Sequence, residues 1–313
     1  MQPLILVFGI DFLSAGRGGQ MRAEEACKVC TRKKARMYTE LYQASEERKE
    51  EVLQQTERYL EEAGTSQSAP KMMAGVLDLL KKETGILDPY ERIKREYNQM
   101  LLSMEEEISR CIHEAKDPFR AALQYVTVGN YIDFGALSDV NEEQLRKLLN
   151  GCGDLALDLD EVMHFQEELG RAWELLYITD NAGEIVLDKI FMKVLKELYP
   201  KLQIHVLVRG EPVLNDATLE DAKMIGLNRI ARVIPNGTSI PGTEYAQISK
   251  EARECMDRAD LCLAKGQGNF ESLRECGKNI YYLFLCKCDL FVDRFQVERL
   301  TPAFVNELRM EHQ

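Results

Sequence analysis

The chain has 313 residues, of which 45% are hydrophobic and 29% charged, as is usual for a globular protein with one or two domains. Its net charge of −12 argues against a general nucleic-acid binder, because such proteins present a basic face to the phosphates. No stretch approaches the roughly 18–20 apolar residues of a membrane span, so we expect neither nucleic acid nor a membrane as a partner.

The first twenty residues differ from the rest of the chain. Residues 4–10 are apolar but short, follow no basic segment and are interrupted by Asp11, unlike a secretory signal. Residues 14–20 are typical of a linker, so we expect residues 1–20 to be an N-terminal extension, and the residues leave open whether Met1 or Met21 is the native start. Nine scattered cysteines favour a reduced protein in the cytoplasm.

Residues 21–170 are expected to form a helical domain. One charged, amphipathic helix is expected over residues 35–63, and Ser68-Ala69-Pro70 predicts the start of the next. Asp-Pro pairs at 88–89 and 117–118 predict two more helices, reaching about residues 108 and 128, because proline fits the first turn and aspartate caps it.

Residues 171–313 are expected to form an α/β domain. Short apolar runs alternate with helical patterns, which predicts a mostly parallel sheet with helices on both faces. The expected strands are 175–179, 204–208, 232–234, 261–264 and 280–285, and the expected helices are 184–198, 218–226, 243–257, 270–277 and 302–311. Ligands of such sheets bind outside the carboxyl ends of the strands.

A first polar motif, Asp180-Asn181-Ala182-Gly183-Glu184, follows the first expected strand and opens a helical pattern. Its carboxylate and amide oxygens suit a hard cation, and the N–H groups of a helix beginning at Gly183 suit an anion. Taken alone, an Asp-Asn pair at this place is more often a turn or a helix cap.

Two further motifs follow the second and fourth strands. Asp216, in the loop 209–218, is either a third oxygen ligand or a cap for the helix near Thr218. In the segment 265–269, Lys265 precedes two glycines that allow close approach of a ligand, or else form only a flexible turn. This order matches neither a Walker loop nor a dinucleotide fingerprint.

Together, the strand ends supply Asp180, Asn181 and Asp216 for a metal, and Lys265 with the backbone of 266–269 for a phosphoryl group. Oxygen ligands fit Mg²⁺ or Mn²⁺ better than zinc. Such a metal polarises a phosphoryl oxygen and lowers the pKa of a bound water. Because the first strand lacks an Asp-x-Asp arrangement, we expect attack by a metal-activated water, oriented by Asp216 or a nearby carboxylate, rather than a phospho-aspartyl intermediate.

These motifs, in this order and spacing, resemble the damage-control phosphatase family, a metal-dependent phosphatase family that also includes proteins described as acidic-residue methyltransferase-like. The resemblance runs from about Met21 to the C-terminus. The matching segments are Asp180–Glu184 with Asp188, Gly210–Asp221, Lys265–Glu271 and Gly129–Gly135. Cys27-x-x-Cys30 and the Cys286-Lys287-Cys288 segment resemble the prokaryotic-type branch of the family.

The resemblance implies a helical region packed on a Rossmann-like α/β domain, and hydrolysis of small phosphometabolites such as sugar phosphates or phosphopantetheine-like esters. It implies a divalent metal, Mn²⁺, Mg²⁺, Co²⁺ or Ni²⁺, held by Asp180, Asn181 and Asp216, with Lys265 contacting the substrate phosphate. The remaining positions expected in the substrate cleft are Asn130, Asp133, Gly183, Glu184, Gly210, Asn236, Gly237, Gly266, Gly268 and Asn269.

The cysteine pairs near the two ends of the chain leave three interpretations open. Cys27, Cys30, Cys286 and Cys288 form one thiolate metal site if the ends meet, or contain a redox-active pair, or are inert thiols.

The sequence therefore predicts a metal-dependent phosphatase acting on a small phosphorylated metabolite, and it does not indicate the oligomeric state. Two alternatives are an S-adenosylmethionine-dependent carboxyl methyltransferase and a non-catalytic metal- or metabolite-binding protein. The first of these is disfavoured because the chain has no glycine-rich methyltransferase loop.

Overall fold

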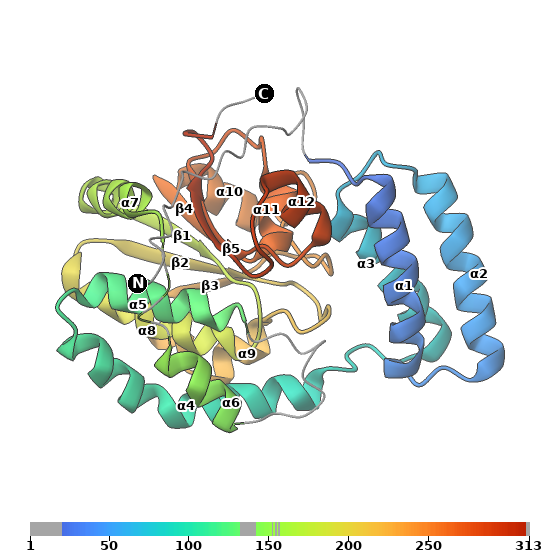
Figure 1. Ribbon diagram of the computed structural model, residues 1–313, viewed down its shortest axis with the longest axis horizontal. Coiled ribbons are helices and arrows are strands. Elements are labelled where there is room, and N and C mark those ends of the chain that lie inside the picture. Colours follow the sequence, from blue (N-terminus) through green and yellow to red (C-terminus); the bar gives the residue numbers. More distant parts are fainter. Residues whose placement is uncertain (1–20, 132–141, 152, 154, 156, 311–313) are drawn as a thin grey trace, which may run out of the picture.

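The computed structural model describes residues 21–131, 142–151, 153, 155 and 157–310 (Figure 1). The expected extension 1–20 and the candidate site residue Asp133 lie outside the described residues. Seven helices precede the first strand in the described part of the chain: α1 (Glu25–Leu41), α2 (Glu46–Ala63), α3 (Ala69–Thr84), α4 (Glu91–Glu114), α5 (Pro118–Gly129), α6 (Glu142–Asn150) and α7 (Leu159–Arg171).

The second part of the chain forms a six-stranded sheet with the order β3-β2-β1-β4-β5-β6. The strands are β1 (Glu174–Ile178), β2 (Gln203–Val208), β3 (Arg232–Pro235), β4 (Leu261–Lys265), β5 (Ile280–Leu285) and β6 (Pro302–Asn306). All pairs are parallel except β5 with β6, so the expected mostly parallel α/β sheet is confirmed. The strand order reverses between the neighbouring strands β1 and β4, and ligands of such sheets bind at this kind of switch point.

Helices cover both faces of the sheet (Figure 1). Alternate side chains of each strand point to opposite faces, so Leu175 and Tyr177 belong to one apolar cluster, whereas Leu176 and Ile178 belong to the other. The helices that connect or follow the strands are α8 (Glu184–Leu198), α9 (Leu219–Met224), α10 (Lys250–Arg258), α11 (Gln267–Leu273) and α12 (Asp289–Phe295). The first cluster is shared with α8, and the second with α10, α11 and α12.

The helical region divides into two parts. Helices α1, α2 and α3 stand beside the sheet as a group with apolar clusters of their own (Figure 1). Buried residues of α4, α5 and α7, such as Leu101, Leu123 and Phe165, belong instead to the same cluster as β1 and α8. Much of the helical region therefore builds the core that supports the carboxyl ends of the strands.

Three expectations about the secondary structure were wrong. Residues 35–63 form two helices rather than one, because the chain turns at Gln43, which has a φ of 50°, and Ser45 caps α2. Residues 302–306 form the edge strand β6 rather than a helix, with Phe304 buried against the sheet. A strand that begins at proline suits a sheet edge, where no N–H is needed. Helix α12 had not been expected at all.

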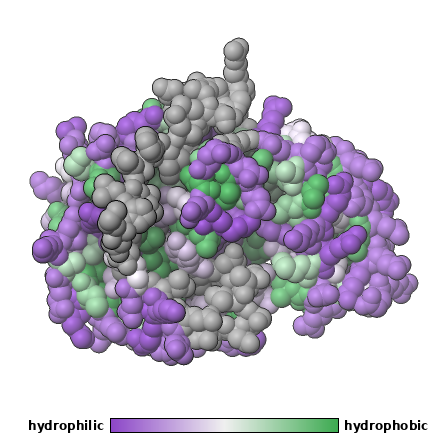
Figure 2. All heavy atoms as spheres, in the orientation of Figure 1, coloured by the Kyte–Doolittle hydropathy of each residue, from purple (hydrophilic) through white to green (hydrophobic). Residues whose placement is uncertain are grey.

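The surface over α1 and α2 is mainly hydrophilic (Figure 2). Residues 46–48 of α2 are exposed, as expected for the solvated face of an amphipathic helix, whereas Val52, Thr56 and Leu60 are buried. No helix among the described residues combines the length and the apolar character needed to cross a bilayer.

Candidate functional site

The loops after β1 and β2 meet at the switch point of the sheet. The Ala217 N–H donates to the Asp180 carbonyl at 2.8 Å, and the Ala182 N–H donates to the Asn215 carbonyl at 2.9 Å. A β-bridge pairs Asn181 with Asp216 directly. The backbone therefore brings together the three residues predicted to hold a metal.

Two asparagines hold the carboxylates of Asp180 and Glu184 beside each other. Asn130, at the end of α5, donates to Asp180 Oδ2 at 2.9 Å and to Glu184 Oε2 at 3.2 Å. Asn181 donates to the same two oxygens at 2.7 and 3.0 Å. The Asn130 amide oxygen accepts from Leu285 N at 3.2 Å, which connects this cluster to the end of β5.

Arg209 is a buried cation that the sequence reading did not single out. Its side chain is 1% exposed, and its Nε donates to Asp216 Oδ2 at 2.6 Å. Nη1 donates to Thr243 and Asn269, while the buried Nη2 has no hydrogen-bond partner and lies 4.0 Å from Asp180 Oδ1. This NH2 group of the guanidinium therefore lies near Asp180 without a hydrogen-bond partner.

Lys265 lies beneath the site rather than at its opening. Leu261, Leu263 and Lys265 alternate along β4, so the lysine side chain lies on the face covered by α5 and α8. It is fully buried and bonds to Glu184, to Asp188 at 3.2 Å and to the Val126 carbonyl at 3.2 Å. Because an ammonium has three donors, this arrangement does not support the expected contact with the substrate phosphate.

The site holds more buried negative than positive charge. Asp180, Glu184, Asp188 and Asp216 surround two buried cations, Lys265 and Arg209. Burial, then the charges of Glu184 and Asp216, raise the pKa of Asp180 to about 8. Burial also raises the pKa of Asp216, and that of Asp188 to about 6. The Glu184 carboxyl differs, because Lys265 outweighs the effect of burial and lowers its pKa.

A third cation, Lys287, acts on the site from the segment after β5. Its charge lowers the pKa of both Asp180 and Glu184, so it lies within electrostatic reach of these carboxylates. Lys287 is partly exposed, unlike Lys265. The sequence analysis named Lys287 only as part of a cysteine motif. No local sequence pattern around Lys287 predicts that it lies near Asp180.

Glycines at the strand ends allow the loops to approach each other. A Cβ on Gly266, which has a φ of +83°, would lie 2.1 Å from Asp180 Oδ2, and one on Gly210 would lie 2.4 Å from the Gly237 backbone. A Cβ on Gly268 would lie 2.3 Å from the Pro241 carbonyl oxygen. These glycines position the surrounding loops, and Gly266 leaves the space that the Asp180 carboxylate occupies.

Three other expected ligand-binding residues make contacts inside the protein. The Gly183 N–H donates to Asn98 Oδ1 at 2.6 Å, so it is not directed at an anion. Asn269 donates to the carbonyls of Thr179 and Lys265 and accepts from Arg209. The Asn236 oxygen accepts from the Gly210 N–H at 2.8 Å. The geometry therefore supports a positioning role for these residues.

A groove lies between α2, α3 and the loops after β2 and β3. Its volume is about 320 Å³, within the range of small-molecule sites. Asp78 of α3 and Glu211 line it together, and burial, with the charge of Glu211, raises the pKa of Asp78. Gly237, one of the expected cleft residues, also lines this groove.

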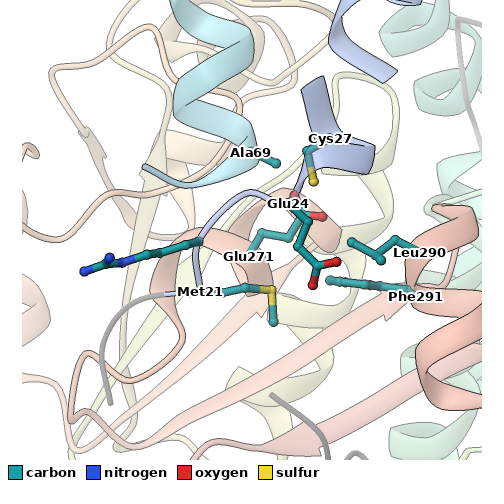
Figure 3. Close-up of a pocket in the computed structure, with 8 residues that line it drawn as sticks. Met21, Glu24, Cys27, Ala69, Glu271, Leu290 and Phe291 are labelled. Carbon is teal, nitrogen blue, oxygen red and sulfur yellow. The ribbon is translucent and has the colours of Figure 1, made fainter. Parts of the chain in front are cut away.

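The cysteines of α1 approach the beginning of α12. Burial, followed by Glu271, Cys288 and Cys30, raises the pKa of Cys27 to about 12. A cavity of about 10 Å³, enough for one water, is lined by Cys27, Glu24 and Glu271, and Figure 3 shows the Cys27 sulfur beside these carboxylates. All eight cysteines within the described residues are free, and those residues contain no group of three His, Cys, Asp or Glu that could hold a metal ion. Of the three interpretations of these cysteines, the thiolate metal site is therefore not supported by the described residues.

The chain is similar to known proteins over most of its length. A family model described as the damage-control phosphatase ARMT1-like domain matches residues 23–301. An uncharacterized protein of Methanocaldococcus jannaschii, MJ0202, is 31% identical over 90% of this chain and 94% of its own. The damage-control phosphatase PH1575 of Pyrococcus horikoshii is 33% identical over 75% of this chain and 80% of its own.

The fold is also found among solved structures. The crystal structure of PH1575, titled a DUF89 family protein, superposes with a TM-score of 0.83 and 26% sequence identity. The match covers 92% of this chain and 99% of that one. The similarity therefore includes both the helical region and the sheet.

Proposed function

We propose that this chain, which belongs to the damage-control phosphatase ARMT1-like family, is a phosphatase that requires a divalent metal ion. Its proposed substrates are small phosphorylated metabolites. The observation that carries the proposal is the buried charge cluster at the carboxyl ends of β1, β2 and β4. Four carboxylates there face two buried cations, so ionisation of all four leaves an excess of two negative charges. A divalent cation would offset this excess.

The donor set fits a hard cation that keeps several waters. Asp180, Asn181 and Asp216 offer two carboxylates and one amide, and oxygen ligands of this kind suit Mg²⁺ or Mn²⁺. The Asn181 oxygen accepts from Asn215 Nδ2 at 2.8 Å. With a cation bound, a half-turn of the Asn181 amide would direct its oxygen toward the cation, with loss of the present hydrogen bonds to Asp180, Glu184 and Asn215. When bound, the metal would polarise a phosphoryl oxygen and lower the pKa of a water.

The remaining residues act on the phosphoryl group and on the attacking water. Arg209 Nη2, buried without a partner, would donate to a phosphoryl oxygen and stabilise the charge that develops there. Lys287 would add a further positive charge within electrostatic reach of Asp180. Asp216, held by Arg209 Nε, would orient the attacking water. Lys265 would hold Glu184 and Asp188 in place from below.

The groove between α3 and the loops after β2 and β3 would accept the part of the substrate that is not phosphate. Glu211 is two residues from Arg209, so the groove begins next to the proposed phosphoryl site. Asp78 and Glu211 can accept hydrogen bonds from the hydroxyl or amino groups of a substrate. We expect Asp78→Asn to raise KM more than it lowers kcat, because this residue does not touch the reacting atoms.

The experiment that tests the proposal is phosphate release from a panel of sugar phosphates, nucleotides and phosphopantetheine esters. It compares chelated protein with protein supplied with Mn²⁺, Mg²⁺, Co²⁺ or Ni²⁺, for the wild type and Asp180→Ala. We expect turnover only with metal, and loss of turnover in the variant. Turnover that is insensitive to the chelator would refute the metal requirement, and binding of S-adenosylmethionine without phosphate release would favour the methyltransferase alternative.

A further inference from the structure

A buried asparagine of the helical region contacts both loops that carry the candidate metal residues. Asn98 of α4 is 0% exposed, and its Oδ1 accepts from the Gly183 N–H at 2.6 Å. Its Nδ2 donates to Asp221 Oδ1 at 2.8 Å. One side chain of α4 therefore bonds to the turn after β1 and to the first turn of α9, which follows the loop after β2.

Both contacts are close in sequence to the candidate metal residues. Gly183 follows Asp180 and Asn181 by two or three residues and has a φ of +75°. Asp221 accepts from the N–H and the hydroxyl of Thr218, both at 2.8 Å, and Thr218 follows Asp216 by two residues. Moving Asn98 would therefore release both loops at positions next to Asp180 and Asp216.

The chemistry of the contact requires an amide. The turn after β1 presents an N–H donor, and α9 presents a carboxylate acceptor, so the side chain between them must accept on one side and donate on the other. An amide does both within one rigid plane, whereas a carboxylate only accepts. Since all these groups are buried, a missing partner would leave the Gly183 N–H or the Asp221 carboxylate unsatisfied, which is costly.

We infer that Asn98 is a positioning residue for phosphate-ester hydrolysis: it fixes the turn after β1 and the loop after β2 relative to each other, so that Asp180 and Asp216 face one another. The inference rests on the proposed function only in its catalytic consequence. It assigns α4, which is remote in sequence from the site motifs, a direct part in building the site.

The experiment exchanges the polarity of the hydrogen bond. Asn98→Asp places two carboxylates face to face. Asp221→Asn replaces one of two acceptor oxygens by an NH2 group, so the oxygens that accept from Asn98 and from Thr218 are no longer both present. Each single variant therefore breaks a hydrogen bond from a different side. In the double variant, the new carboxylate at position 98 would accept from the Gly183 N–H and from the new amide at position 221, whose oxygen accepts from Thr218. The double variant therefore restores these hydrogen bonds at unchanged net charge, whereas the ion pair of 3.9 Å between Lys94 and Asp221 is not restored.

Met104→Ala is the matched control, because Met104 lies on the same helix, is 1% exposed and belongs to the main apolar cluster without contacting either loop through a hydrogen bond. It should lower the melting temperature with kcat within about twofold of wild type. We expect each single variant at position 98 or 221 to lower kcat about 10- to 100-fold, because displacements near 1 Å have effects of this size. The double variant should recover most of the loss.

A second readout does not depend on activity. Amide hydrogen exchange of residues 180–188 should accelerate in both single variants, return toward wild type in the double variant, and remain slow in Met104→Ala. Single variants with wild-type kcat and wild-type exchange, or a folded double variant without recovery, would overturn the inference. If the wild type releases no phosphate with any metal, the proposed function fails, while the exchange data still decide whether Asn98 fixes the turn.

Discussion

Gly266→Ala tests whether the placement of the Asp180 carboxylate controls activity. The glycine adopts φ 83° and ψ 153°, and the Cβ of an alanine would lie 2.1 Å from Asp180 Oδ2 and 2.2 Å from its Cγ. Since such contacts are not tolerated below about 3 Å, the carboxylate would have to move by about 1 Å. Displacement by this distance lowers turnover about 100-fold, and the backbone strain lowers the free energy of unfolding by about 1–3 kcal/mol.

The matched control is Gly277→Ala. Gly277 has a φ of +75°, and its added Cβ would meet nothing within 4 Å. The control therefore introduces comparable backbone strain, about 1–2 kcal/mol, without touching the site.

The assay measures kcat for phosphate release together with urea unfolding of both variants. We expect both variants to lose stability but only Gly266→Ala to lose activity. Equal activity of the two alanine variants, with Gly266→Ala folded, would refute the assigned role of Asp180.

Three further predictions concern the buried charges. Because burial, Glu184 and Asp216 raise the pKa of Asp180 to about 8, the folded protein loses stability as the pH rises from about 4 toward 8. The metal-free Asp180→Asn variant should therefore have a higher melting temperature than the wild type at pH 8, with a smaller difference at pH 5. A lower melting temperature of the variant at pH 8 would contradict the charge excess. Lys265→Met leaves the carboxylates of Glu184 and Asp188 without their cation and should lower the free energy of unfolding by about 3–5 kcal/mol in urea titrations. A change below about 1 kcal/mol would show that the cation is not needed for the stability of the fold. Burial raises the pKa of Glu105, but hydrogen bonds from two lysines lower it overall, so the stability that Glu105 contributes is present at neutral pH and lost as the pH falls through its folded-state pKa. The melting temperature of Glu105→Gln should lie below that of the wild type at neutral pH, and the difference should shrink on acidification. A difference that does not change with pH would exclude this ion pair as its cause.

The fold and the placement of the three metal candidates could be predicted from local patterns. Short apolar runs gave the five strands that form the parallel part of the sheet, and the carboxyl ends of parallel strands lie at one edge. Asp180 and Asn181 come just after β1, and Asp216 lies in the loop after β2, so the topology places all three at the same edge of the sheet. Edge strand β6 was missed because a short apolar run fits a helix as well as a strand.

The roles of individual side chains were harder to predict. Lys265 was expected in the cleft, although its alternation with Leu261 and Leu263 places it on the face under α8, a signal that the sequence already contained. Arg209 and Lys287 carry no such local signal, since their positions beside Asp180 depend on where whole loops pack. Asn98 could not be found either, because its hydrogen bonds reach Gly183 and Asp221, which are 85 and 123 residues away in the sequence.

The most direct test of the metal-dependent site is anomalous scattering from crystals of the wild-type protein soaked in Mn²⁺ at a concentration that supports phosphate release. The account predicts a peak within coordination distance of the carboxylates of Asp180 and Asp216, about 2–2.5 Å from their oxygens. A peak elsewhere, or none under conditions in which the enzyme is active, would contradict it.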